Sequence, residues 1–295
     1  MTSTLFDAIA EAAVRLNAAG VDSPKLAAQV LLAHTLGVTR SQLLAFSPQH
    51  LLQPHQLVIY RTLVTRCVTG EPMAYVVGHT EFYALDFSTD RRALIPRPET
   101  ELLVELALAR IKLQKSNLRS QIADVGTGCG CIAVALATQL PEARLIATDI
   151  SADALSLARE NAQRHKVSSR IQFLQGDLLA PAPVQIEGVV ANLPYVSTAE
   201  WQGLPRHIRE HEPRIALDGG ADGLDLFRRL FSQAAQYLRP DGWLLLEIGA
   251  TQGQAVSALA RQAFPRAAVN LHKDYAGLQR IVEIQFHAGL GARVQ

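Results

Sequence analysis

Apolar residues near the start of the chain recur at helical spacing. The residues that share one face are Leu5, Ile9, Ala12, Ala13 and Leu16. This period predicts an amphipathic helix, and Gly20 ends it because glycine readily closes a helix. Further helices are predicted over 24–35, 39–46 and about 54–70. We therefore expect residues 1–72 to form a small helical bundle.

The next stretch changes from helical to strand character. Its strand-forming residues are Tyr75, Val76, Val77, Phe82, Tyr83 and Phe87. Gly78 and Asp86 interrupt them, so we predict a β-hairpin linker over residues 73–96. An amphipathic helix is expected to follow from Glu99 or Thr100.

Further along, apolar strands alternate with helical stretches. Strands are predicted over 121–125, 144–148, 171–175, 188–191 and 243–248. Helices are predicted over 130–139, 152–164, 222–238 and 252–264. Such alternation is typical of an α/β domain, in which helices cover both faces of a mostly parallel sheet.

Two more strands, near 267–272 and 280–286, complete a seven-stranded sheet. The loop between them has about seven residues, which is too short for a helical crossover and predicts an antiparallel pair. We therefore assign residues 97–287 to one α/β domain and residues 288–295 to a tail.

Composition and charge narrow the class of protein. Of the 295 residues, 48% are hydrophobic and 19% are charged, with a formal net charge of +1. This balance is ordinary for a globular enzyme and gives no bulk charge for holding nucleic acid. The N-terminus lacks the basic region of a signal peptide, and no apolar run approaches the ~20 residues that span a bilayer. We expect a cytoplasmic protein without a membrane partner.

The three cysteines do not have the spacing of a metal site. Cys129 and Cys131 are separated by one residue, and Cys67 lies far from them. Structural zinc needs four ligands, so we expect no metal and interpret these cysteines as small packing residues.

A glycine-rich turn follows the strand at 121–125 and opens the next helix. From Asp124 to Gly130 the chain reads Asp-Val-Gly-Thr-Gly-Cys-Gly. Glycines let a ligand approach the backbone closely, but their spacing here is not that of dinucleotide-binding proteins. The carboxylate of Asp124 would repel a pyrophosphate, whereas it suits the cationic amino group of a methionine moiety, directly or through water. The turn therefore points to S-adenosylmethionine.

Two further acids follow the next two strands. Asp149 ends the second strand, where a carboxylate can accept both ribose hydroxyls. Asp177 follows the third strand, where a carboxylate can accept from the exocyclic amine of adenine. Ligands of open α/β sheets bind at this edge, so the acids and the glycine turn together predict an adenosyl-cofactor site.

The fourth strand continues directly into Asn192-Leu193-Pro194-Tyr195. An amide or aromatic amine nitrogen is a poor nucleophile because its lone pair is delocalised. The side-chain oxygen of Asn192 and the carbonyl of Leu193 can accept its two N–H bonds and bind more tightly as positive charge develops. Pro194 stiffens the turn, and Tyr195 offers a flat face to a planar group. We interpret this loop as the methyl-acceptor site.

With these motifs in place, the chain resembles the bacterial release factor glutamine methyltransferases, the PrmC or HemK family. The resemblance covers nearly the whole chain. Its most specific part is Ile-Pro-Arg-Pro-Glu-Thr-Glu at 95–101, and it includes Glu-Pro-Arg at 212–214 and Gly-Gly-Ala-Asp-Gly-Leu at 219–224.

The resemblance implies a class I methyltransferase domain behind a helical N-terminal domain and a hairpin linker. It implies S-adenosylmethionine as cofactor, S-adenosylhomocysteine as product, and a release factor as partner, with the glutamine of its Gly-Gly-Gln motif as methyl acceptor. By motif match, the cofactor contacts are Gly126, Thr127, Gly128, Cys129, Gly130, Asp149, Leu178 and Asn192. The same match gives Asn192 to Tyr195 as the residues that hold the glutamine.

The acceptor loop departs from the family pattern at one position. The family has Asn-Pro-Pro-Tyr, whereas this chain has Leu193 in place of the first proline. Leucine keeps the backbone carbonyl, so we expect the chemistry to survive with some loss of rigidity.

Two rival functions use the same features. An adenine-amino methyltransferase grips a flipped base with a similar loop, and the basic residues after the loop fit nucleic acid as well as a solvated face. A non-catalytic adaptor would keep the cofactor fold and bind partners through its helical domain. The neutral balance of charge leads us not to expect nucleic acid as a partner.

Overall fold

The computed structural model describes residues 3–113 and 121–287, so the predicted tail at 288–295 lies outside the described residues. The chain divides into two compact units. The first takes in the chain up to His79 together with Pro205–His211, and the second takes in Thr80–Leu204 and the chain from Glu212 onward. The domain boundaries proposed from the sequence stay predictions, because compactness alone does not assign a domain.

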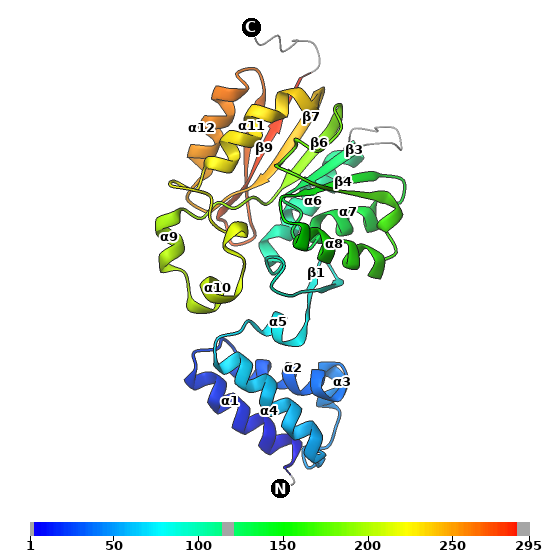
Figure 1. Cartoon of the computed structure of the whole chain (residues 1–295), viewed down its shortest axis with the longest axis vertical. Coiled ribbons are helices and arrows are strands. Elements are labelled where there is room, and N and C mark those ends of the chain that lie inside the picture. Colours follow the sequence, from blue (N-terminus) through cyan, green and yellow to red (C-terminus); the bar gives the residue numbers. More distant parts are fainter. Residues whose placement is uncertain (1–2, 114–120, 288–295) are drawn as a thin grey trace. The chain divides into compact units, whose positions relative to one another are not determined.

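The first unit is built from helices (Figure 1). They are α1 (Leu5–Ala18), α2 (Pro24–Leu36), α3 (Arg40–Leu44), α4 (Pro54–Val68), α5 (Met73–Val77) and α10 (Arg206–His211). The Thr39 hydroxyl caps α3 by accepting from the backbone N–H of Gln42, and Gly37 closes α2 in the left-handed conformation. The Ser23 side chain, whose type and position before Pro24 predict a cap, makes no capping hydrogen bond at the start of α2. Buried leucines and alanines make the core, in which the Tyr60 hydroxyl donates to the carbonyl of Ala28 at 3.1 Å.

The hairpin forms, but two expectations about it were wrong: the residues before it are helical, and Asp86 does not interrupt its strands. Tyr75–Val77 belong to helix α5, which starts after Pro72 and ends at Gly78; their burial in a helical turn outweighs their strand propensity. Asp86 lies inside a strand instead of breaking one, since β1 (His79–Phe82) pairs with β2 (Leu85–Ser88). The hairpin turns at two residues with positive φ, Tyr83 (52°) and Ala84 (56°). Glycine or asparagine usually signals such a turn, and neither residue type is present here to predict it.

The second unit contains a seven-stranded sheet. Its strands are β3 (Gln121–Val125), β4 (Arg144–Asp149), β5 (Ile171–Gln175), β6 (Ile186–Ala191), β7 (Leu238–Glu247), β8 (Ala268–Lys273) and β9 (Gln279–Gln285). Their order is β5-β4-β3-β6-β7-β9-β8. β9 runs antiparallel to both of its neighbours, β7 and β8, which confirms the predicted final pair.

Helices cover both faces of this sheet (Figure 1). The longer ones are α6 (Glu101–Leu113), α7 (Cys131–Gln139), α8 (Ala152–Arg164), α11 (Asp225–Tyr237) and α12 (Gly253–Ala263), and the shorter ones are α9 (Thr198–Gly203), η1 (Pro98–Thr100), η2 (Ser168–Arg170) and η3 (Arg214–Ala216). Residues of α6, α7 and α8 share one buried apolar cluster, and residues of α11 and α12 share the other. Within 3–113 and 121–287, no helix has both the length and the apolar character needed to cross a bilayer.

Candidate active site

The register of the central strands brings the predicted site loops together. In the parallel sheet, Val125 at the end of β3 pairs with Ala191 at the end of β6. The glycine turn that follows β3 and the Asn192 loop that follows β6 therefore leave the sheet side by side. Between β3 and β6, the order in which successive strands are added to the sheet reverses. Open α/β sheets bind their ligands at such a point.

Three glycines shape the first of these loops. Gly126, Gly128 and Gly130 all have positive φ, at 73°, 56° and 83°, a conformation that other residues adopt only with strain. The N–H groups of Gly126 and Thr127 both donate to the carbonyl of Thr148, each at 2.9 Å. The turn is thus held against the end of β4 and then continues into α7.

Asp124 lies beneath this turn and is almost fully buried. Its Oδ2 accepts from the Thr127 hydroxyl at 2.6 Å and from the backbone N–H of Ala133 at 3.1 Å. Its Oδ1 has no hydrogen-bond partner among the described residues. Burial raises the pKa of Asp124 to about 7, against the opposing effect of these hydrogen bonds.

Asp149 lies at the end of β4 with both carboxylate oxygens facing backbone amides. The N–H of Gly128 donates to Oδ2 and the N–H of Ser151 donates to Oδ1, each at 2.9 Å. Burial raises the pKa of this carboxyl, and the two amide donors oppose the rise. Each carboxylate oxygen has two acceptor sites, so Asp149 keeps capacity for a pair of hydroxyl donors.

Asp177 and Leu178 follow β5 at the same edge of the sheet. Asp177 forms an ion pair with Arg229 of α11. Leu178 is buried and has a positive φ of 50°, which is uncommon for a branched residue.

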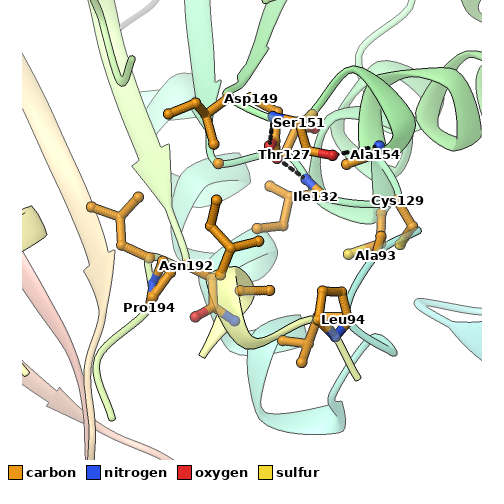
Figure 2. A pocket seen from close by; sticks show the side chains of 18 of the residues that line it. Ala93, Leu94, Thr127, Cys129, Ile132, Asp149, Ser151, Ala154, Asn192 and Pro194 are labelled. Atoms are coloured by element: carbon orange, nitrogen blue, oxygen red, sulfur yellow. Dashed lines mark hydrogen bonds between the residues drawn. The ribbon is translucent and has the colours of Figure 1, made fainter. Parts of the chain in front are cut away.

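These loops enclose a cavity of about 300 Å³. The predicted residues that line it are Gly126, Thr127, Gly128, Cys129, Asp149, Asp177, Leu178, Asn192, Leu193 and Pro194. Figure 2 shows Asn192 and Pro194 on one side of this space and Cys129 on the other. Three predicted residues, Asp124, Gly130 and Tyr195, are not among the described residues that line it. Their proposed contacts with a ligand stay predictions.

The predicted acceptor loop is anchored at its first two residues, Asn192 and Leu193. The side-chain nitrogen of Asn192 donates to the Thr100 hydroxyl oxygen at 3.1 Å. The Leu193 side chain is buried and packs against the glycine turn: a Cβ placed on Gly126 would lie 3.2 Å from Leu193 Cδ2. Leucine at this position therefore fixes the loop by packing.

A second glycine segment supports the rest of the loop from behind. A Cβ on Gly219 would lie 2.5 Å from the carbonyl oxygen of Pro194, and one on Gly223 would lie 2.3 Å from that of Tyr195. The side chain of Gln252 also donates to the Tyr195 carbonyl at 2.8 Å. Burial raises the pKa of the Tyr195 phenol to about 12, so it stays neutral.

Sequence reasoning missed several contributors to this site. Thr100 and the segment Arg92–Arg97 line the cavity, and Glu247 approaches Asn192 from β7. Glu247 carried a usable signal, since it is an acid that directly follows the apolar run from Trp243 to Leu246. Within the described part of the chain, no group of three or more His, Cys, Asp or Glu is placed to hold a metal ion.

Comparison with known proteins adds to this geometry. The family model of the PrmC N-terminal domain matches residues 7–78, and that of the methyltransferase small domain matches residues 100–206. The chain is 46% identical to the release factor glutamine methyltransferase of Moorella thermoacetica over 278 residues, which cover 94% of this chain and 96% of that protein. It belongs to the release factor glutamine methyltransferase family. The relative of that name from Nitratidesulfovibrio vulgaris is 38% identical, with 95% and 94% coverage.

A solved structure supports the fold of this family member. The T. thermophilus 16S rRNA N2 G1207 methyltransferase (RsmC), in complex with AdoMet and guanosine, aligns with a TM-score of 0.50 at 15% identity. The alignment covers 71% of this chain and 50% of that one. The class I methyltransferase fold and the helical N-terminal region expected from the sequence are confirmed, as is the family resemblance.

Proposed function

We propose that this protein transfers a methyl group from S-adenosylmethionine to the side-chain amide nitrogen of the glutamine in the Gly-Gly-Gln motif of peptide chain release factors. One observation carries the proposal: in a chain of this family, the pairing of Val125 with Ala191 sets the glycine turn beside the Asn192 loop. A release factor substrate implies action in the cytoplasm.

The residues around the cavity fit the cofactor. S-adenosylmethionine supplies a methyl group on a sulfonium sulfur. The glycine turn gives the ligand close access to the backbone, and the Asp149 carboxylate suits the ribose hydroxyls. Asp177 and Leu178 would contact the adenine. The unpartnered Oδ1 of Asp124 suits the amino group of the methionine moiety through a bridging water.

Asn192 and Leu193 would position the glutamine amide. The Asn192 side-chain oxygen and the Leu193 carbonyl accept its two N–H groups and orient the nitrogen toward the methyl group. Positive charge develops on that nitrogen during transfer, so the two acceptors bind the transition state more tightly than the substrate. The glycine contacts behind Pro194 and Tyr195 keep the loop in place, and positioning supplies much of the rate of such reactions.

Transfer of labelled methyl groups to purified release factor tests this proposal. We expect label on the unmodified factor and none on a factor whose motif glutamine is changed to alanine. Equal label on both factors would overturn the substrate assignment. A parallel reaction with duplex DNA addresses the adenine-methylating alternative, for which binding should weaken steeply with salt.

A further inference from the structure

Asn192 lies between two neighbours that the sheet register provides. Val125 pairs with Ala191 on one side, and Ala191 pairs with Leu246 of β7 on the other. Glu247 follows Leu246 directly, as Asn192 follows Ala191, so these two side chains leave adjacent strands at the same level. Glu247 is 1% exposed and does not belong to the described lining of the cavity.

Thr100 completes a cluster of three polar side chains. It is the last residue of η1 and is 2% exposed. The Asn192 amide nitrogen donates to the Thr100 hydroxyl oxygen at 3.1 Å, and both side chains lie close enough to the Glu247 carboxyl to lower its pKa.

The direction of these hydrogen bonds follows from the chemistry of the groups. An ionised carboxylate carries no hydrogen, so Glu247 can only accept from the Thr100 hydroxyl or the Asn192 amide. A hydroxyl has one hydrogen, so Thr100 can only accept from Asn192 once that hydrogen is donated. One N–H group of Asn192 is thereby directed at Thr100, and the ionised Glu247 carboxylate beside it is an acceptor for the other.

This arrangement decides which end of the Asn192 carboxamide meets the substrate. The oxygen and nitrogen of a carboxamide have the same shape but opposite hydrogen-bonding roles. If the amide turned over, the cavity would meet an NH₂ group, which cannot accept from the glutamine N–H. Because the Asn192 nitrogen donates to Thr100, the Asn192 oxygen remains to accept from the substrate.

We propose that Thr100 and Glu247 are positioning residues that orient Asn192, so that its side-chain oxygen faces the methyl acceptor when Glu247 is ionised. The inference rests on the proposed function. A purely structural role does not explain a carboxyl group at position 247. An apolar side chain at this buried strand end would avoid the cost of desolvating a carboxylate. Its Oε2 has no partner among the described residues, so that cost is only partly offset.

Three substitutions test the inference through release factor methylation. Thr100→Val removes the hydroxyl and keeps the shape, and we expect kcat to fall by at least about tenfold while the KM for S-adenosylmethionine stays within about twofold. Thr100→Ser restores the hydroxyl and should recover most of the lost kcat. Glu247→Gln replaces the pure acceptor by a group that can also donate, and it should lower kcat as Thr100→Val does.

A pH profile separates positioning from a general loss of structure. Burial raises the pKa of Glu247 to about 7, with Glu99 adding to the rise and Arg280, Thr100 and Asn192 opposing it; the Tyr195 phenol also faces this carboxyl. Since the ionised form orients Asn192, wild-type kcat should fall as the pH drops through about 7. Glu247→Gln should lack this acidic limb.

The outcomes are distinct. A Thr100→Val enzyme with wild-type kcat would overturn the inference, and so would a Thr100→Ser enzyme no faster than Thr100→Val. Calorimetric binding of S-adenosylmethionine to the same preparations shows whether each variant is folded. If the wild-type protein itself fails to label release factor, the proposed function fails instead.

Discussion

Asn192 makes hydrogen bonds that a shorter side chain cannot make. Its nitrogen donates to Thr100, and its oxygen is the proposed acceptor for the glutamine amide. The proposed cofactor contacts are made mainly by other residues that line the cavity, those of the glycine turn and Asp149. Loss of the Asn192 side chain should therefore affect turnover more than cofactor binding.

We expect Asn192→Ala to reduce kcat by at least about a hundredfold, as loss of a transition-state acceptor does, with little change in the affinity for S-adenosylmethionine. Steady-state methylation and calorimetry on one preparation measure the two effects. Asn270→Ala is a matched control, because Asn270 is exposed on β8. Unchanged kcat in Asn192→Ala would exclude the proposed role.

Leu193 provides a second test at the scale of one residue. Its side chain is 2% exposed and contacts the glycine turn. Leu193→Ala should lower the free energy of unfolding by about 2–5 kcal/mol and raise the KM for S-adenosylmethionine, since both loops lose a packing partner. The same change at Leu278, which is 50% exposed, should do neither. Denaturant unfolding that does not distinguish the two variants would contradict this expectation.

At the scale of elements, residues 217–223, which precede α11, fold back onto the proposed acceptor loop. The N–H of Val196 donates to the carbonyl of Leu217, and the N–H of Gly219 donates to the carbonyl of Val196. Gly219 and Gly223 then lie so close to the loop carbonyls that no Cβ fits between them. These glycines therefore set the position of the loop.

We expect Gly223→Ala to reduce kcat for release factor because its Cβ would displace the Tyr195 carbonyl, 2.3 Å away. Gly277→Ala is the matched control: its φ of 81° resembles the 74° of Gly223, but nothing lies within 4 Å of its Cβ. Both variants should lose similar stability from backbone strain, whereas only Gly223→Ala should lose turnover. Equal kcat in the two variants would show that the segment does not position the loop.

At the scale of the whole molecule, two buried carboxyl groups link stability to pH. Burial raises the pKa of both Asp124 and Glu247 to about 7, whereas unfolded carboxyl groups titrate near 4. The fold thus favours their protonated forms. Their contribution to stability is complete below the unfolded pKa and is lost as the pH rises through about 7.

We therefore expect the melting temperature to rise as the pH is lowered from about 8 to about 6. Thermal unfolding across this range measures the effect, and Glu247→Gln should weaken the dependence. A wild-type melting temperature that stays constant or falls would contradict it. Turnover should change in the opposite direction, because an ionised Glu247 orients Asn192; activity and stability then favour different pH values.

The features that depend on residues close together along the chain could be predicted from the sequence by itself. Helix periodicity predicted α1, α2 and α4 closely, because this signal arises within one or two helical turns. The alternation of strands and helices predicted the parallel sheet. Parallel strands end at a common edge, so the residues after β3, β4, β5 and β6 could be assigned to one site.

The features that depend on burial and on contacts between distant segments were decided only by the tertiary structure. Helix α5 and the turn at Tyr83 and Ala84 depend on burial and on positive φ values that no local residue type announces. Asp124 lies under the glycine turn because neighbouring strand residues face opposite sides of the sheet. Thr100 is 92 residues from Asn192 along the chain, and such contacts follow from register and packing between distant segments, which have no periodic signature in the sequence.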